Sequence, residues 1–267
     1  MTNDQLVDQI MSAVMTKISA DRPAAPAARQ QVTVPEATQF VGTTALGDTI
    51  GLVIPNVDPQ LHALMGIDPG FRSIGIIGDR TGAGPQIFAA DEGVKATNTE
   101  IVSIELARDT KGGAGHGSLI VFGAEDVSDA RRAVEVTLGE LERTFGDVYG
   151  NDAGHLEFQY TARASHALNK AFGAPLGKSF GITVGAPAAI GVVLADTAVK
   201  ASTIDVIAYS SPSKGTSHSN EVISAFTDGY AENLEELHEA IVAAREVGLG
   251  LLGAMGDAPV STTTPYI

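Results

Sequence analysis

The sequence contains the same pattern of residues twice, at an offset of 105 or 106 positions. Pro69–Ile76, PGFRSIGI, corresponds to Pro175–Ile182, PLGKSFGI. Ala90–Ala96, ADEGVKA, corresponds to Ala195–Ala201, ADTAVKA. A Lys-Gly pair and a histidine in a later loop of each half follow a similar offset. Near-constant spacing at several places indicates a tandem duplication, so the chain has to fold as two similar units.

Each repeat mixes strand-like and helix-like apolar spacing. In the first repeat we expect strands over 50–54, 73–78, 100–106 and 118–122, and helices over 59–65, 85–97 and 128–145. The order βαβαββα predicts an α+β fold rather than a strict alternation of parallel strands and helices.

The segment before the first repeat has a different character. Residues 4–19 place apolar side chains at intervals of three and four, which predicts an amphipathic helix, and an Ala/Pro-rich linker follows it. A short helix on a linker cannot bury its apolar stripe alone, so we expect it to dock either on a partner or on its own chain. The predicted organisation is a helix and linker at 1–37, repeats at 38–150 and 151–256, and a tail at 257–267.

Composition excludes several classes of function. The chain has no cysteine, which rules out disulfides, thiolate metal sites and thiol nucleophiles. Its 17 basic residues against 32 acidic ones, a net charge of −15, argue against a nucleic-acid partner. The sequence has no apolar run of about 18 residues and no secretory signal at its start, so we expect no membrane association.

No catalytic, metal or cofactor site is predicted. Gly177–Gly181 fits G-x-S-x-G, but Ser179 opens a strand, whereas a nucleophile elbow needs the serine after one. Gly78–Pro85 lies between a strand and a helix, as a phosphate loop does, but it lacks the residues of a P-loop and the G-x-G-x-x-G spacing. This turn leaves one alternative open, a nucleotide-binding or small-ligand enzyme or sensor built on tandem ferredoxin-like domains.

Charged and imidazole side chains recur at equivalent positions of the two repeats. Asp91 and Lys95, like Asp196 and Lys200, have the i, i+4 spacing of a helical ion pair, which on a surface contributes less than about 1 kcal/mol. Their repetition suggests a shared geometric role. His116 and His218 each lie in a Gly/Ser-rich loop, where they either line an opening or are simply solvated.

These motifs resemble the bacterial microcompartment shell domain. The motif Ala-Asp-x-x-Val-Lys-Ala is followed by a strand, a small-residue loop, a strand and a helix, and each repeat starts with what would be the final strand and helix of the ordinary domain. That order is similar to the circularly permuted tandem shell proteins, above all those of propanediol-utilisation compartments. The similarity covers essentially the whole chain and includes Asp109–Gly117, Thr144–Tyr149, Tyr160–Ser165 and Ala208–Pro212.

The resemblance implies a structural protein and no cofactor. Two tandem circularly permuted ferredoxin-like shell domains would form a homotrimer that is a pseudohexamer, and these discs would tile with other shell proteins edge to edge. The location implied is the shell of a microcompartment in the cytoplasm. Small polar metabolites such as 1,2-propanediol or glycerol are the implied ligands of its openings. We further hypothesise that the helix at 4–19 faces the lumen and docks encapsulated enzymes or another shell component.

The resemblance also implies two sets of site residues. The pore loops correspond to Gly115, His116 and Gly117 in the first repeat and to Ser217, His218 and Ser219 in the second. The contacts at the tile edge correspond to Asp91, Lys95 and Asn98, and to Asp196 and Lys200. The second repeat has Thr203 where the first has Asn98, so only one type of edge keeps the full set.

Overall fold

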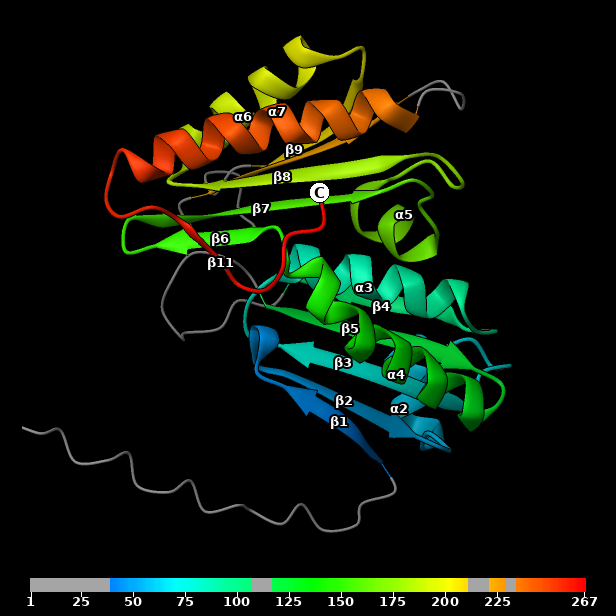
Figure 1. Cartoon of the computed structure of the whole chain (residues 1–267). Helices are drawn as coiled ribbons and strands as arrows, with labels where there is room; N and C mark the ends of the chain where they lie inside the picture. Colours follow the sequence, from blue (N-terminus) through cyan, green and yellow to red (C-terminus); the bar gives the residue numbers. More distant parts are fainter. Residues whose placement is uncertain (1–38, 107–116, 211–220, 229–233) are drawn as a thin grey trace, which may run out of the picture. The chain divides into compact units, whose positions relative to one another are not determined.

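Two antiparallel sheets, one for each repeat, organise the molecule (Figure 1). The computed structural model describes residues 39–106, 117–210, 221–228 and 234–267. The predicted helix at 4–19 and its linker lie outside these residues. Strand order is β1-β2-β3-β5-β4 in the first sheet and β11-β6-β7-β8-β10-β9 in the second. This architecture confirms the predicted α+β fold.

The described residues of the first repeat form nine elements. They are β1 (Phe40–Thr44), a 3-10 turn η1 (Leu46–Asp48), β2 (Thr49–Ile54), α2 (Pro59–Leu64), β3 (Ser73–Asp79), α3 (Ala83–Lys95), β4 (Glu100–Glu105), β5 (Ser118–Ala124) and α4 (Val127–Thr144). The order βαβαββα is present, with β1 added in front because it pairs with β2 although its own sequence has no apolar run.

The rest of the described chain, which comprises the second repeat and the residues on either side of it, follows the same plan. Its elements are β6 (Val148–Asn151), β7 (Gly154–Thr161), α5 (His166–Phe172), β8 (Phe180–Ala186), α6 (Ala188–Ala201), β9 (Asp205–Ser210), β10 (Val222–Thr227), α7 (Leu234–Gly253) and β11 (Val260–Ser261). Two helices pack on each sheet, α3 and α4 on the first and α6 and α7 on the second. None of the helices in the described part of the chain is long and apolar enough to cross a membrane.

Close approach between α3 and α4 depends on one glycine. A Cβ atom at Gly93 would lie 2.6 Å from Oγ1 of Thr137 and 2.8 Å from the carbonyl oxygen of Ala133. Glycine therefore allows the two helices to touch over the face that covers the first sheet.

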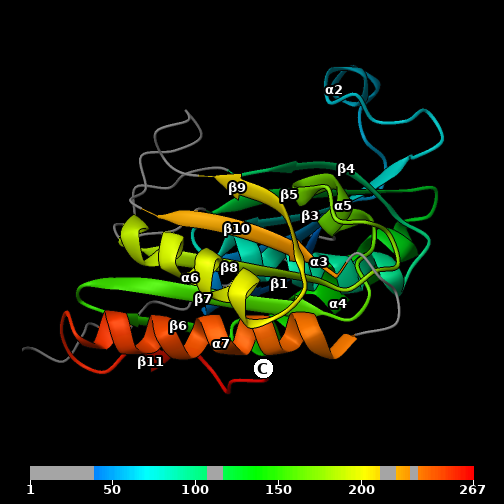
Figure 2. The same cartoon turned by 90° about the horizontal axis from the view of Figure 1, so that it is seen from above.

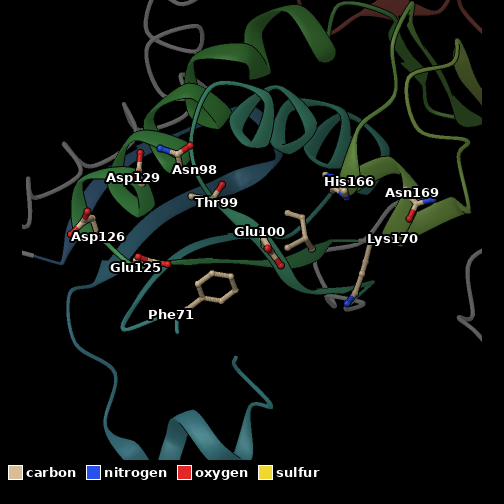
Figure 3. A pocket seen from close by; sticks show the side chains of 11 residues that line it. Phe71, Asn98, Thr99, Glu100, Glu125, Asp126, Asp129, His166, Asn169 and Lys170 are labelled. Atoms are coloured by element: carbon tan, nitrogen blue, oxygen red, sulfur yellow. The ribbon is translucent and has the colours of Figure 1, made fainter. Parts of the chain in front are cut away.

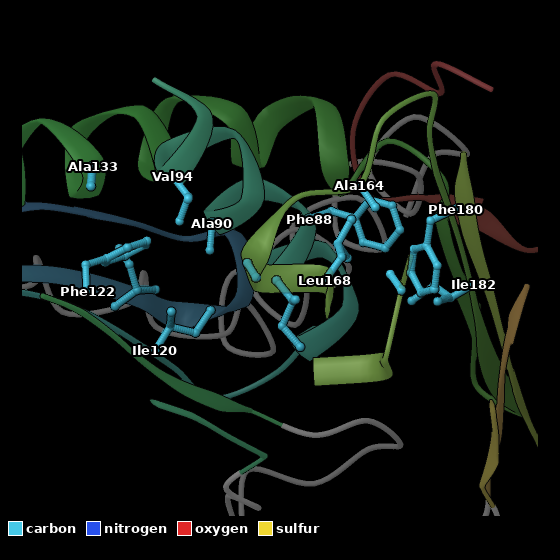
Figure 4. Close-up of a cluster of buried hydrophobic side chains, with 14 of the residues drawn as sticks. Phe88, Ala90, Val94, Ile120, Phe122, Ala133, Ala164, Leu168, Phe180 and Ile182 are labelled. Atoms are coloured by element: carbon cyan, nitrogen blue, oxygen red, sulfur yellow. The ribbon is translucent and has the colours of Figure 1, made fainter. Parts of the chain in front are cut away.

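The largest cluster of buried apolar side chains joins the two repeats. Phe88 of α3 lies against Phe180 of β8 with the ring centroids 5.7 Å apart (Figure 4). Phe172 of α5 stacks on Phe180 at the same distance. The repeats consequently share one core, and separating them would expose large aromatic surfaces to water.

Three buried residues connect the repeats. Phe145, Gly146 and Asp147 lie between the end of α4 and the start of β6. The carboxylate of Asp147 accepts hydrogen bonds from the backbone N–H groups of Tyr266 at 2.8 Å and Ile267 at 3.0 Å. The last residues of the sequence thus return to the connection and hold it in place.

Candidate functional site

The predicted pore loops fall almost entirely outside the described residues. Gly117 is described and directly precedes β5. The remaining predicted pore residues lie in the stretches without a described structure; they are Gly115, His116, Ser217, His218 and Ser219. Their role in lining a pore stays a prediction.

The first predicted edge pair lies at the contact between the repeats. Asp91 is only 1% exposed, and its carboxylate accepts hydrogen bonds from the backbone N–H groups of Ser165 at 3.0 Å and Leu168 at 3.2 Å. Lys95 lies 3.0 Å from Asp91 and keeps part of its side chain in solvent. Asp91 is therefore bound within the chain, at the start of α5, while the ammonium group of Lys95 reaches the surface.

The equivalent pair in the second repeat has no such cover. Lys200 lies 2.6 Å from Asp196, but the two side chains are 71% and 56% exposed. The same Asp-x-x-x-Lys spacing thus gives a pair with a buried carboxylate in α3 and a pair with both side chains exposed in α6. The difference arises because α5 packs on α3, and no described segment of the chain covers α6 in that way.

Asn98 lines an open polar groove of about 760 Å³ beside the same contact (Figure 3). His166, Asn169 and Lys170 reach it from α5. Acidic side chains line it from the first repeat; they are Glu100, Glu125, Asp126 and Asp129. Charged side chains of both signs therefore lie around Asn98, and its role at a tile edge stays a prediction.

A buried group of ionisable residues, not predicted from the sequence, lies on the second sheet. Nε2 of His155 is 3.5 Å from Oε1 of Glu157 and 3.6 Å from Oε2 of Glu221. Burial lowers the pKa of His155, but the close approach of Glu157 and the charges of both carboxylates outweigh that effect and raise the pKa overall. A protonated imidazole between two carboxylates compensates one of their two negative charges.

A third carboxylate, the half-buried Asp79, lies near this group at the end of β3. Desolvation raises the pKa of Asp79 to about 7, and the charge of Glu157 adds to the rise, against hydrogen bonds from Ser118. The hydroxyl and the backbone N–H of Ser118 both donate to Asp79. Ser118 follows the first predicted pore loop and Glu221 follows the second, so buried polar groups flank both loops.

The arrangement offers little to a metal or a nucleophilic reaction. The described residues contain no group of three or more histidine, aspartate or glutamate side chains placed to bind a metal ion. Ser179 is buried, and its backbone carbonyl oxygen accepts a hydrogen bond from the hydroxyl of Thr227 at 2.8 Å. Ser179 therefore takes part in the hydrogen bonding at the start of the strand.

Comparisons with known proteins agree on one family. No family model matches the chain. The chain is 54% identical to the bacterial microcompartment shell protein PduB of Citrobacter freundii, over 100% of both sequences.

Two solved structures have the same fold over most of the chain. The crystal structure of a trimeric bacterial microcompartment shell protein PduB superposes with a TM-score of 0.82 at 49% identity, over 86% of this chain and 100% of that one. EtuB from Clostridium kluyveri superposes with a TM-score of 0.82 at 52% identity, over 87% of this chain and 100% of that one.

Proposed function

The chain belongs to the PduB family of bacterial microcompartment shell proteins, and from that membership we propose that three copies form a pseudohexameric tile of a propanediol-utilisation type shell. The observation that carries the proposal is 54% identity to PduB over the full length of both sequences. The chain is thus a structural shell component, and the alternative of an enzyme or nucleotide sensor is not supported.

We assign the repeats at 38–150 and 151–256 as the two shell domains of the tile. Two similar sheets that share a core supply the rigid body such a tile needs. Three copies would then place six similar domains around one axis, which is the closed symmetry favoured by homo-oligomers.

The edge of the tile is assigned to Lys95, Asn98 and Lys200. Both lysines are near the ends of their helices, and an ion pair with Asp91 or Asp196 holds each in place. Asp91 and Asp196 therefore act by positioning the lysines. Symmetric contacts between such edges would extend single discs into a layer.

Passage of small polar metabolites such as 1,2-propanediol or glycerol is assigned to the loops that contain His116 and His218. The residues that flank these loops support a polar route, because Ser118 and Glu221 are buried next to Asp79 and His155 rather than among apolar side chains. The predicted helix at 4–19 is assigned to docking encapsulated enzymes.

Electron microscopy of negatively stained protein at high concentration and low salt tests the tile. Flat layers of hexagonally packed discs with threefold symmetry are the expected result, and a variant with Lys95→Ala and Lys200→Ala should give separate discs. Particles that never pack into layers, even with hexameric shell partners, would contradict the proposal.

The cargo assignment has its own test. Deletion of residues 1–30 should reduce the amount of enzyme recovered with purified compartments while shells still form. Unchanged enzyme content would contradict the assignment of residues 4–19 to cargo docking and would leave the proposed tile standing.

A further inference from the structure

The last residues of the sequence lie in a cleft that binds them through backbone groups. The carboxylate of Asp147, which is fully buried, accepts hydrogen bonds from the backbone N–H groups of Tyr266 at 2.8 Å and Ile267 at 3.0 Å. The guanidinium of Arg245 donates to the main-chain oxygen of Ile267, and it also donates to Asp147 at 3.1 Å. Donors and acceptors of the chain end are thus matched in the way that proteins bind a peptide segment.

The side chains of these two residues have their own places in the cleft. The ring of Tyr266 lies under the guanidinium of Arg143, whose central carbon is 5.1 Å from the ring centroid. Its hydroxyl accepts a hydrogen bond from the backbone N–H of Tyr160 at 3.3 Å and donates to the carbonyl oxygen of the same residue at 3.4 Å. Ile267 packs against the buried apolar cluster of the second repeat. The cleft therefore accepts an aromatic residue followed by an aliphatic one.

The preceding residues lie across the connection between the repeats. The hydroxyl of Thr263 donates to the carbonyl oxygen of Glu142 at 2.6 Å, and that of Ser261 donates to the carbonyl oxygen of Gly146 at 2.6 Å. A Cβ atom at Gly146 would overlap the carbonyl oxygen of Thr264, so glycine leaves the space that the backbone of residues 257–267, the tail, needs. We call this site the tail cleft; it is formed by Glu142, Arg143, Gly146, Asp147, Tyr160 and Arg245.

The joint between α7 and the tail is exposed and simple. Residues 254–258 are all exposed. Turn hydrogen bonds at the end of α7 connect this joint to the rest of the chain, as does a bond of 2.8 Å from the side chain of Asn151 to the carbonyl oxygen of Asp257. Strand β11 adds two residue pairs with β6. Release of the tail would therefore remove β11 and leave the other strands of the second sheet in place.

An open groove of about 540 Å³ continues the cleft beyond Ile267. Tyr160 and His238, whose rings meet edge to face with centroids 5.4 Å apart, line it from the second repeat, and Glu92 lines it from the first. Figure 2 shows the chain end at the surface, on the side of the molecule that carries α7. The groove therefore gives an incoming segment access to the cleft without displacement of a helix or strand.

We propose that the tail cleft also binds the tail of a second copy of this chain, so that two copies exchange their last residues. Both copies keep every contact described above, because the exchanged tail has the same sequence as the tail it replaces. Exchange of identical elements is a low-cost way to join two chains. Extended, residues 257–267 span at most about 40 Å, which is enough to reach a neighbouring molecule.

Crowding decides which tail fills the cleft. Tethering favours the tail of the same chain in dilute solution, because linkage gives it an effective concentration on the order of 1 mM. Exchanged tails should therefore accumulate where many copies are packed together. The inference goes beyond the proposed tile and does not depend on it.

Crosslinking of full-length chains tests the exchange, and the absence of cysteine makes it clean. One variant carries Thr264→Cys in the tail. A second variant, with a larger affinity tag, carries Glu142→Cys at the cleft, where Thr263 makes its contact. A short bismaleimide added to the concentrated mixture should give a product with the summed mass of the two chains, and its yield should rise with incubation time and protein concentration.

Two controls show whether the product requires recognition of the tail. Tyr266→Ala in the tail donor should lower the yield by about tenfold, because it removes the ring that Arg143 and Tyr160 hold. Asp205→Cys in place of Glu142→Cys should give no product, since Asp205 is exposed on β9, at the opposite edge of the second sheet from β11. Circular dichroism should show that every variant is folded.

Fluorescence anisotropy isolates the recognition step. The probe is a labelled peptide of residues 260–267, and the receptor is a chain that lacks these residues. We expect saturable binding that is weaker by about tenfold for a peptide with Tyr266→Ala and unchanged for one with Thr264→Ala, because the side chain of Thr264 is exposed. The full-length chain, whose own tail fills the cleft, should bind the probe far less.

The crosslinking decides between exchange and a tail confined to its own chain. Absence of the product at the highest concentration, or a yield that Tyr266→Ala leaves unchanged, would overturn the exchange even if the peptide binds. If the truncated chain fails to fold, the full-length variants still give the answer. Neither result bears on the proposed tile, whose layers are tested independently by electron microscopy.

Discussion

The carboxylate of Asp91 accepts a hydrogen bond at 3.2 Å from the backbone N–H of Leu168, which lies 77 residues further along the chain. Desolvation raises the pKa of Asp91, although Lys95 and the backbone donors of Ser165 and Leu168 act in the opposite direction. One side chain of the first repeat thereby fixes the position of a helix in the second.

Replacing Asp91 should therefore destabilise the whole chain. Asp91→Ala leaves two buried backbone donors without their acceptor, and we expect a loss of about 2 kcal/mol in the free energy of unfolding. Glu92→Ala is the control, because it removes an exposed ion pair with Lys95 and should cost less than about 1 kcal/mol. Urea denaturation measures both values, and equal losses would show that Asp91 does not join the repeats.

Asp79 should make stability fall as the pH rises. Its pKa is about 7 in the folded chain against an ordinary value of 3.8, so the folded state binds more protons between these values and loses stability as the pH increases through this window. The total effect is a few kcal/mol at most. Asp79→Asn should flatten the dependence of the urea midpoint on pH between 4 and 7 (roughly the span of the two pKa values). An unchanged slope would contradict the assignment.

His155 should be needed to hold two buried carboxylates together. His155→Ala removes the imidazole that lies within 3.6 Å of both Glu157 and Glu221, which we expect to cost about 3 kcal/mol near neutral pH. Because the pKa of His155 is raised, its contribution is present below the ordinary value of 6.5 and disappears as the pH rises through the folded value.

The exposed His166 provides the comparison for this variant. His166→Ala should change the free energy of unfolding by no more than about 0.5 kcal/mol. Thermal or urea unfolding of the two variants decides the matter, and similar stabilities would mean that His155 carries no compensating charge.

Removal of Tyr266 and Ile267 should loosen the connection between the repeats. Asp147 would lose two backbone donors and keep the Tyr149 hydroxyl and Arg245, so we expect a loss of about 2 kcal/mol. Tyr266→Ala keeps both backbone N–H groups but loses the ring over Arg143 and the hydrogen bonds of its hydroxyl with the backbone of Tyr160, which should cost about 1 kcal/mol. If the substitution and the deletion destabilise equally, the side chain of Tyr266 matters and the backbone hydrogen bonds to Asp147 do not.

The order of elements is predictable from the sequence because buried strands are continuous apolar runs. The same pattern also recurs in the second repeat, which supports the assignment made in the first. Strand β1 has no such signal, since Gly42, Thr43 and Thr44 follow its first two apolar residues. It forms through pairing with β2. Tertiary pairing of this kind overrides a weak local pattern.

The candidate site shows where local pattern stops being informative. Asp91–Lys95 and Asp196–Lys200 are equivalent in sequence, yet burial of Asp91 depends on α5, far away along the chain. His155 and Glu157 occupy alternate positions of β7 on either side of Leu156, which is the pattern of a strand with one polar face. That face is buried because α3 of the first repeat packs closely on it: a Cβ atom added at Gly84 would lie 2.9 Å from Glu157. The alternation of residues in β7 does not reveal this contact between the repeats.

The three buried residues between α4 and β6 have a mechanical consequence. A connection this short, fixed by the hydrogen bonds of Asp147, leaves no hinge about which one repeat can swing against the other. A closed shell must nevertheless curve around its contents. Each chain then behaves as a stiff plate, and the curvature has to be taken up at the seams between plates.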